Sequence, residues 1–199
     1  VGPLFHGVKV KIAEDGEILV SGENVMNGYW NDPDATSKTL INGWIHTGDI
    51  GEFDKENYLK ITDRKKDILV NAGGDNISPS RVEAKLDIEP EIAQSMLYGD
   101  FKNYLVAVIV PDKDFAINWA KDNSKNQNFE SIVKDEDFKK KINEVVNKVN
   151  KNLSVIEHVR KFILIDHEFT IENSMMTPSM KVRRFVVKNK YGEELEKLY

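Results

Sequence analysis

The chain has 199 residues, of which 40% are hydrophobic and 31% charged, enough for one globular core or for a small domain with part of another. A net charge of −5 argues against broad nucleic-acid binding, because neutralising many phosphates requires a basic surface. The absence of cysteine excludes disulfides, thiolate metal sites and a cysteine nucleophile.

Targeting and metal-binding signals are weak throughout the chain. No apolar run approaches the roughly 18 residues that cross a bilayer, and Val1-Gly2-Pro3-Leu4 lacks the character of a signal peptide. We therefore expect a cytoplasmic location without a transmembrane segment, and leave peripheral membrane contact open. The four histidines show no HxH or HxxxH spacing, so no metal site is expected.

The sequence of residues 1–65 predicts a small β-rich unit. Val8–Ile12 and Glu17–Val20 flank Asp15-Gly16, a pair typical of hairpin turns. A loop-rich stretch follows, with two further short strands before residue 63. Because this unit is too short to bury much core and opens abruptly, we interpret it as the end of a larger N-terminal domain.

Residues 66–199 predict a compact α+β domain, with a small central sheet and flanking helices. The apolar residues between Ser131 and Leu153 recur at helical spacing, which predicts one amphipathic helix. A terminal helix is expected over 184–198, interrupted or ended near Gly192. The remaining predicted elements are a helix over 80–86 and strands over 68–70, 92–97, 105–110 and 162–165.

Three segments contain residues suited to binding chemistry, although each has a simpler interpretation. Asn42–Asp49 ends in Thr-Gly-Asp, which taken alone most often forms a tight turn. Asp63–Pro79 joins a basic turn to a Gly-Gly loop, where a backbone could pass close to a ligand. Thr177–Arg184 places a lysine just beyond a proline-bearing loop, where lysines are usually solvated.

Together, these segments resemble consecutive motifs of the adenylate-forming superfamily of acyl-CoA synthetases, luciferases and peptide-synthetase adenylation domains. The similar stretches read GEILVSGENVMNGYWNDPDAT, GWIHTGDIGEFDKENYLKITDRKKD, GGDNISPSRVE and TPSMKVRRFVV, and the resemblance runs from residue 7 to the end. The motifs DRKKD and TPSMKVRR resemble those of the long-chain fatty acid branch of this superfamily. Met180 stands where many relatives have glycine, so the shape of this loop is not fixed by the resemblance.

The resemblance implies roles for residues around the first two segments. Asp49 and Arg64 match the family residues that hold the nucleotide ribose, a task suited to a carboxylate acceptor and a rigid guanidinium donor. Lys66 matches the hinge about which the small domain turns. A hinge residue is one whose backbone can absorb a large change in dihedral angles.

It also implies roles for the glycine loop and the C-terminal lysine. Lys181 matches the lysine that bridges the carboxylate substrate and the α-phosphate during adenylation, where a positive charge stabilises the transition state. Gly73 and Gly74 match the loop that lines the pantetheine tunnel, where small residues allow close approach.

The implied function is activation of a fatty acid with ATP to an acyl-adenylate, followed by transfer to CoA with release of AMP. The family's phosphate loop, adenine segment and acyl pocket are not found here. We therefore expect a C-terminal portion that is inactive alone, with Mg²⁺ bound mainly by the N-terminal domain. The alternatives are another adenylate-forming enzyme, for a shorter or aromatic acid or a carrier protein, and a non-catalytic interaction domain.

Overall fold

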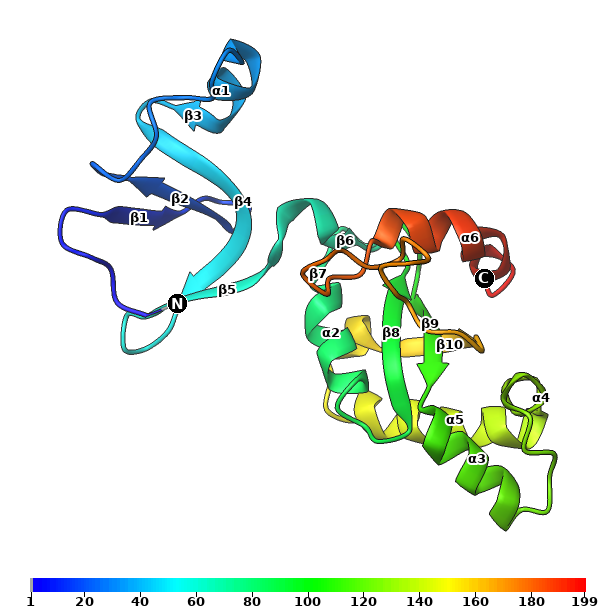
Figure 1. Ribbon diagram of the computed structural model, residues 1–199. Coiled ribbons are helices and arrows are strands. Elements are labelled where there is room, and N and C mark those ends of the chain that lie inside the picture. Colours follow the sequence, from blue (N-terminus) through cyan, green and yellow to red (C-terminus); the bar gives the residue numbers. More distant parts are fainter. Residues whose placement is uncertain (1) are drawn as a thin grey trace. The chain divides into compact units, whose positions relative to one another are not determined.

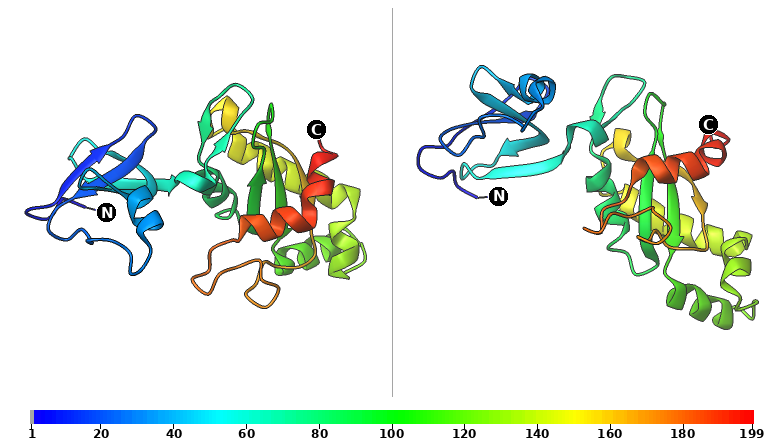
Figure 2. Two further views of the ribbon diagram at one scale, coloured as in Figure 1. Left: turned by 90° about the horizontal axis from the view of Figure 1, so that it is seen from above. Right: turned by 45° about the horizontal axis from the view of Figure 1, so that its top comes forward.

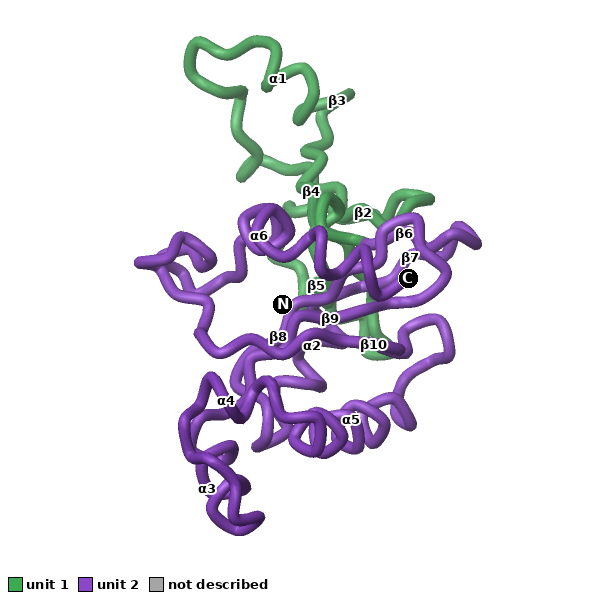
Figure 3. Tube along the Cα trace, turned by 90° about the vertical axis from the view of Figure 1, so that its right-hand side faces the viewer, with its two compact units in different colours: residues 1–68 green, residues 69–199 purple. Residues whose placement is uncertain are grey.

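The computed structural model describes residues 2–199, which divide into a first unit ending at Ile68 and a second unit, Leu69–Tyr199 (Figure 3). Each unit has its own sheet, and helices accompany the strands in both. The mixed α+β class predicted from the sequence is thus confirmed (Figure 1).

The first unit is an antiparallel sheet with the strand order β1-β2-β4-β3, and β5 also pairs with β4. Its strands are β1 (Lys9–Ile12), β2 (Glu17–Ser21), β3 (Leu40–Ile41), β4 (Trp44–Phe53) and β5 (Leu59–Arg64). The predicted hairpin joins β1 to β2, with Gly16 in its turn at φ 84°. The long β4 contacts three strands, and its pairing with β5 shifts register between Ile50 and Gly51, as at a β-bulge.

The apolar core of the first unit is small. Ile18, Leu19 and Leu59 are its buried hydrophobic residues, whereas Phe5 and Trp30 are 85% and 91% exposed. The helix α1 (Pro33–Thr39) buries no residue and begins where the Asp32 side chain accepts a hydrogen bond from Ala35 N. The sequence predicts a loop-rich stretch here and not this helix, because Asn31-Asp32-Pro33 is also typical of turns.

The second unit is built around a three-stranded sheet with the order β10-β9-β8, in which β10 runs parallel and β8 antiparallel to β9. These strands are β8 (Ile92–Tyr98), β9 (Leu105–Pro111) and β10 (Val159–Leu164). Every residue of β9 is buried. A separate short hairpin pairs β6 (Leu69–Val70) with β7 (Asn76–Ile77).

Helices cover both faces of this sheet, which makes the second unit three layers deep (Figure 2). Leu105, Ala107 and Ile109 of β9 pack with α2 (Pro79–Leu86), α3 (Lys113–Asp122), α4 (Phe129–Val133) and α5 (Glu136–Asn150). The alternate residues Val106, Val108 and Val110 pack with α6 (Arg184–Glu196) and with Ile165, Phe169 and Met175 of the preceding loop. This alternation follows from the period of two in a strand.

Two helix predictions were wrong in detail. The single helix expected between Ser131 and Leu153 is divided into α4 and α5, because the Asp135 side chain accepts hydrogen bonds from Asp137 N and Phe138 N and so starts a new helix. The helix α6 continues through Gly192, with Tyr191 and Leu195 anchored in the core on either side of it. Burial of these neighbours outweighs the low helix propensity of glycine.

Candidate functional site

Asp49 and Arg64, the predicted ribose-binding pair, are brought together by the first unit. They are directly opposite in the β4–β5 register, and Arg64 Nε lies 2.9 Å from Asp49 Oδ1. A quarter of the Asp49 side chain and half of the Arg64 side chain remain exposed, at 25% and 52%. Within residues 2–199 the Asp49 carboxylate and the Arg64 guanidinium form no hydrogen bond or ion pair with any third residue. It therefore presents an acceptor and a donor to solvent side by side.

Asp49 lies at an irregularity of β4, where its pairing with β2 shifts register as at a β-bulge, and side-chain contacts to β2 hold this segment. Thr47 Oγ1 donates to Ile18 O at 2.7 Å and accepts from Asp49 N at 3.1 Å. Gly48 has φ 69°, a left-handed conformation that suits glycine. The Thr-Gly-Asp sequence thus supplies both the bulge in β4 and the side chain that anchors it.

Glu17 is a buried carboxylate in β2, opposite this bulge, that sequence reasoning missed. It is 4% exposed, and its oxygens lie 2.9 Å from Gly48 N, 3.0 Å from Lys65 Nζ and 3.0 Å from His46 Nδ1. Burial favours the neutral acid, but these three contacts outweigh it and hold the pKa of Glu17 below its usual value. The sequence carries one signal for it, an acidic residue that opens an apolar strand.

The predicted hinge residue Lys66 lies in a short 3-10 turn, η1 (Lys65–Asp67), directly after β5. The two adjacent lysines differ in their contacts. Lys65 Nζ is 2.6 Å from Asp15 Oδ2 and 3.0 Å from Glu17, and these carboxylates raise the pKa of Lys65. Lys66 has no side-chain hydrogen bond or ion pair within residues 2–199. The chain is thus fixed by side chains up to Lys65 but not at Lys66.

Gly73 and Gly74 occupy the tip of the β6–β7 hairpin. Asn71 organises this tip, since its Oδ1 accepts hydrogen bonds from Gly73 N at 2.9 Å and Asp75 N at 2.8 Å. Gly74 has φ 87°, and a Cβ built there meets no atom within 4 Å. Gly74 therefore leaves open space at the tip, whereas a Cβ at Gly73 would meet Asn71 Oδ1 at 3.3 Å.

Lys181 lies on a tight loop whose ends are joined by hydrogen bonds. Thr177 N donates to Lys181 O at 2.9 Å, and Thr177 Oγ1 accepts from Lys181 N at 3.1 Å. Met180, which stands where many relatives have glycine, has φ 59°. The Lys181 side chain is exposed and has no partner among the described residues. The loop therefore keeps a left-handed turn without glycine and leaves the lysine available.

A buried ion pair connects the elements that follow these two loops. Arg184, the first residue of α6, binds Glu83 of α2 through both guanidinium ends, with Nη1 2.6 Å from Oε1. Glu83 Oε1 also accepts a hydrogen bond from Leu97 N in β8 at 2.7 Å. Gly73–Gly74 and Lys181 thus lie on the loops that precede the two helices joined by this ion pair.

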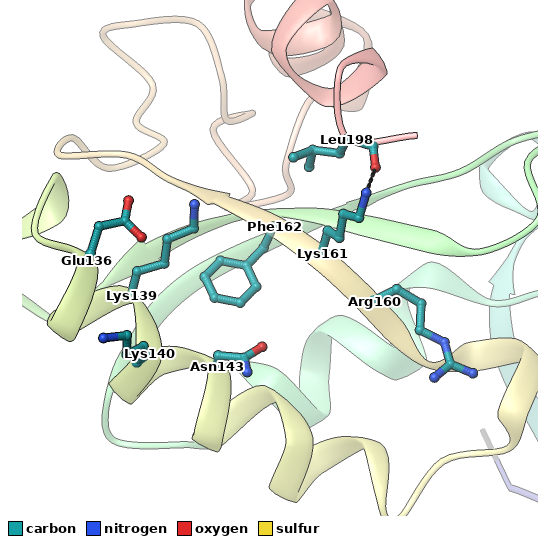
Figure 4. A pocket seen from close by; sticks show the side chains of 8 residues that line it. All are labelled: Glu136, Lys139, Lys140, Asn143, Arg160, Lys161, Phe162 and Leu198. Atoms are coloured by element: carbon teal, nitrogen blue, oxygen red, sulfur yellow. Dashed lines mark hydrogen bonds between the residues drawn. The ribbon is translucent and has the colours of Figure 1, made fainter.

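A groove of about 300 Å³ lies elsewhere in the second unit, between α5 and β10. Figure 4 shows the Phe162 ring facing α5, while the Lys161 ammonium donates to Leu198 O. Lys139, Lys140 and Arg160 complete its basic lining, and no predicted site residue belongs to it. Over residues 2–199 no three potential metal-binding side chains gather, and no helix is long and apolar enough to cross a membrane.

The second unit matches a known protein family. Residues 66–199 match the AMP-binding enzyme C-terminal domain. The chain is 37% identical over its full length to the long-chain-fatty-acid–CoA ligase FadD15 of Mycobacterium tuberculosis, of which it covers 34%. It is 35% identical over 93% of its length to human long-chain-fatty-acid–CoA ligase 1, of which it covers 27%. The chain thus spans about a third of the length of such curated relatives.

Solved structures are similar to both units of the chain. The adenylation domain of a carboxylate reductase from Mycobacterium chelonae aligns with 99% of the chain at 27% identity and a TM-score of 0.81, over 31% of that protein. The corresponding domain from Segniliparus rugosus, in complex with AMP and a co-purified carboxylic acid, aligns with 99% of the chain at 26% identity and a TM-score of 0.80, over 32% of that protein. The chain therefore belongs to the AMP-binding enzyme C-terminal domain family, and its curated relatives are long-chain fatty acid–CoA ligases.

Proposed function

We propose that this chain is the C-terminal part of an ATP-dependent long-chain fatty acid–CoA ligase and is inactive without the large N-terminal domain. The observation that carries the proposal is the Asp49–Arg64 pair, whose side chains lie 2.9 Å apart on adjacent strands and remain partly exposed, so that a nucleotide ribose could reach both. The type of reaction is taken from the relatives, because ligases match the chain over its whole length.

In the first half-reaction a fatty acid carboxylate oxygen attacks the α-phosphorus of ATP. The new P–O bond gives the acyl-adenylate, and the bond to pyrophosphate breaks. Asp49 and Arg64 would hold the ribose, while the free ammonium of Lys181 would offset the negative charge that develops around the α-phosphate. Magnesium would enter with ATP and be held mainly by the N-terminal domain.

In the second half-reaction the CoA thiol attacks the acyl carbonyl, the thiol proton is lost and AMP leaves with the electron pair of the broken C–O bond. We propose that residues 66–199 form a mobile lid that turns about Lys66, while residues 1–65 end the large domain. Gly73 and Gly74 would then line the path of pantetheine. Closure of such a lid also excludes water from the hydrolysable mixed anhydride. We place the reaction in the cytoplasm.

The test is to assay each half-reaction separately in the ligase that contains this chain. Lys181→Ala should lower ATP–pyrophosphate exchange by about 100- to 1000-fold, as loss of one such stabilising contact does, while preformed acyl-adenylate is still converted to acyl-CoA. Lys121→Ala, at an exposed lysine of α3, is the control and should alter neither step.

Gly74→Leu should have the opposite effect, slowing thioester formation and sparing adenylation. Because φ 87° strains any side chain at this position, Gly74→Ala is the matched control, with the same backbone strain and little bulk. Equal loss of both steps in Lys181→Ala and Gly74→Leu would contradict the proposal.

A second candidate is adenylation coupled to a carrier protein rather than to free CoA. It is supported by the carboxylate reductase from Segniliparus rugosus, whose adenylation and carrier didomain aligns with 99% of the chain at a TM-score of 0.75. Release of AMP on addition of CoA alone favours the ligase, whereas a requirement for a pantetheinylated carrier favours this alternative.

A further inference from the structure

We propose that Glu17 is the positioning residue for the Asp49–Arg64 pair. Its buried carboxylate binds the residue next to Asp49 and the residue next to Arg64. This inference rests on the proposed function in so far as the pair binds ribose. Glu17 itself forms no hydrogen bond or ion pair with either member of the pair within residues 2–199. Two of its three contacts fall on Gly48, next to Asp49, and on Lys65, next to Arg64, and the third is with His46.

The two oxygens of one carboxylate can bind the neighbours of both residues. Glu17 Oε1 accepts from Gly48 N at 2.9 Å, and Oε2 accepts from Lys65 Nζ at 3.0 Å. Gly48 belongs to β4, and Lys65 follows β5, so Glu17 in β2 ties together the two strands that present the pair. Each bond is charge-assisted, which makes it stronger than a bond between neutral groups.

The alternative is that Glu17 serves stability alone. Burial to 4% exposure is costly for a carboxylate unless its oxygens are fully bonded, which accounts for the presence of partners. It does not account for the positions of Gly48 and Lys65, immediately beside the two residues that must face the nucleotide. A purely stabilising role and a positioning role therefore differ in what they predict for nucleotide affinity.

The first measurement is an NMR comparison of the 199-residue chain with its Glu17→Gln variant. Glutamine offers one acceptor oxygen in place of two, so it cannot serve both Gly48 and Lys65. The Gly48 amide and the Arg64 Nε–H should shift, and Arg64 should become more mobile. Glu52→Gln, on the exposed surface of β4, is the matched control and should leave both signals unchanged.

The second measurement is ATP kinetics in the ligase that contains this chain. Because a ribose contact is made equally in the ground state and the transition state, Glu17→Gln should raise KM for ATP with little change in kcat. An increase of about 10-fold is expected for a lost bond to a charged group. A merely structural role would instead lower the fraction of active enzyme, so kcat would fall and KM would not change.

Lys65→Met provides a second variant in case Glu17→Gln unfolds the first unit. It removes the Lys65 contact and leaves the Gly48 contact in place, so the Arg64 signal should move while that of Gly48 does not. Unchanged Gly48 and Arg64 signals in Glu17→Gln, or a lower kcat at constant KM, would overturn the positioning role. NMR shifts as expected with both kcat and KM unchanged would support it and refute the proposed ribose contact instead.

Discussion

Met180 shows how a single residue can keep a turn that its type does not favour. Its φ of 59° lies in the left-handed region, where a non-glycine residue costs about 1–3 kcal/mol. The hydrogen bonds between Thr177 and Lys181 close the loop around it and hold this conformation. The lysine therefore keeps its place on the loop although glycine is absent.

Substitutions at Met180 should separate backbone strain from side-chain contacts. Met180→Gly should leave the free energy of unfolding of the second unit within about 1 kcal/mol of the original value, since relief of strain is offset by the greater freedom of the unfolded chain. Met180→Val should lower it by more than about 1 kcal/mol, because a β-branched residue resists positive φ. Urea titrations followed through β9 amide signals measure both. Equal stability of the two variants would contradict a left-handed turn.

The pKa of Glu17 gives a second prediction at the residue scale. Because its donors lower this pKa, Glu17 adds stability above the unfolded value of about 4.3, and this contribution is lost as the pH falls through the folded pKa. A carbon-13 NMR titration should place the Glu17 midpoint below about 4.3, the ordinary value for a glutamate side chain. A Glu17 midpoint at or above that value would show that burial outweighs the three contacts.

At the scale of elements, the Glu83–Arg184 pair determines how α2 and α6 are connected. These helices lie on opposite faces of the sheet, and each begins shortly after a loop with a proposed function. Because both side chains are largely buried, at 10% and 21% exposure, the pair resists competition from water. It keeps the two loops in a fixed relation within the second unit.

Removing one partner of this pair should be costly. Arg184→Met leaves the Glu83 charge buried and should destabilise the second unit by about 3–5 kcal/mol, whereas Arg183→Met, at the exposed neighbour, should change stability by less than about 0.5 kcal/mol. Adding Glu83→Gln to Arg184→Met should restore part of the loss, since glutamine is neutral and can still accept from Leu97 N. Urea unfolding of the four proteins checks this. A double variant no more stable than Arg184→Met would contradict it.

At the scale of the whole molecule, the two units differ in how much core they bury. The second unit has clusters of buried residues on both faces of its sheet, whereas the first buries few apolar side chains and exposes Trp30 and Phe5. This contrast matches the interpretation of the first unit as the end of a larger domain, whose surface would cover such residues.

Limited proteolysis should reveal the boundary between the units. Trypsin should cut first after Lys66, because this side chain is exposed and forms no hydrogen bond or ion pair within residues 2–199, while Lys65 is held by Asp15 and Glu17. The resistant product should begin at Asp67, as mass spectrometry can establish. Lys66→Gln should slow this cut. Early cleavage within residues 69–199 would contradict the independence of the second unit.

The sequence alone determined the family, the α+β class and most strands, because apolar periodicity and ordered motifs are local properties of the chain. It also identified Asp49, Arg64 and Lys181 as candidates from their motifs. It did not determine where the long amphipathic segment divides, since Asp135 as a helix start depends on which backbone amides its side chain reaches. Nor did it predict α1 or α3.

Only the tertiary structure showed which residues lie beside the candidates. Asp49 and Arg64 are fifteen positions apart and meet because the pairing of β4 with β5 places them directly opposite each other. Glu17 is more distant still, and its contact with Gly48 depends on the pairing of β2 with β4. Residue type and spacing describe what a side chain can do. Which partners a buried carboxylate acquires is decided by sheet register and packing, which bring distant segments into hydrogen-bonding range.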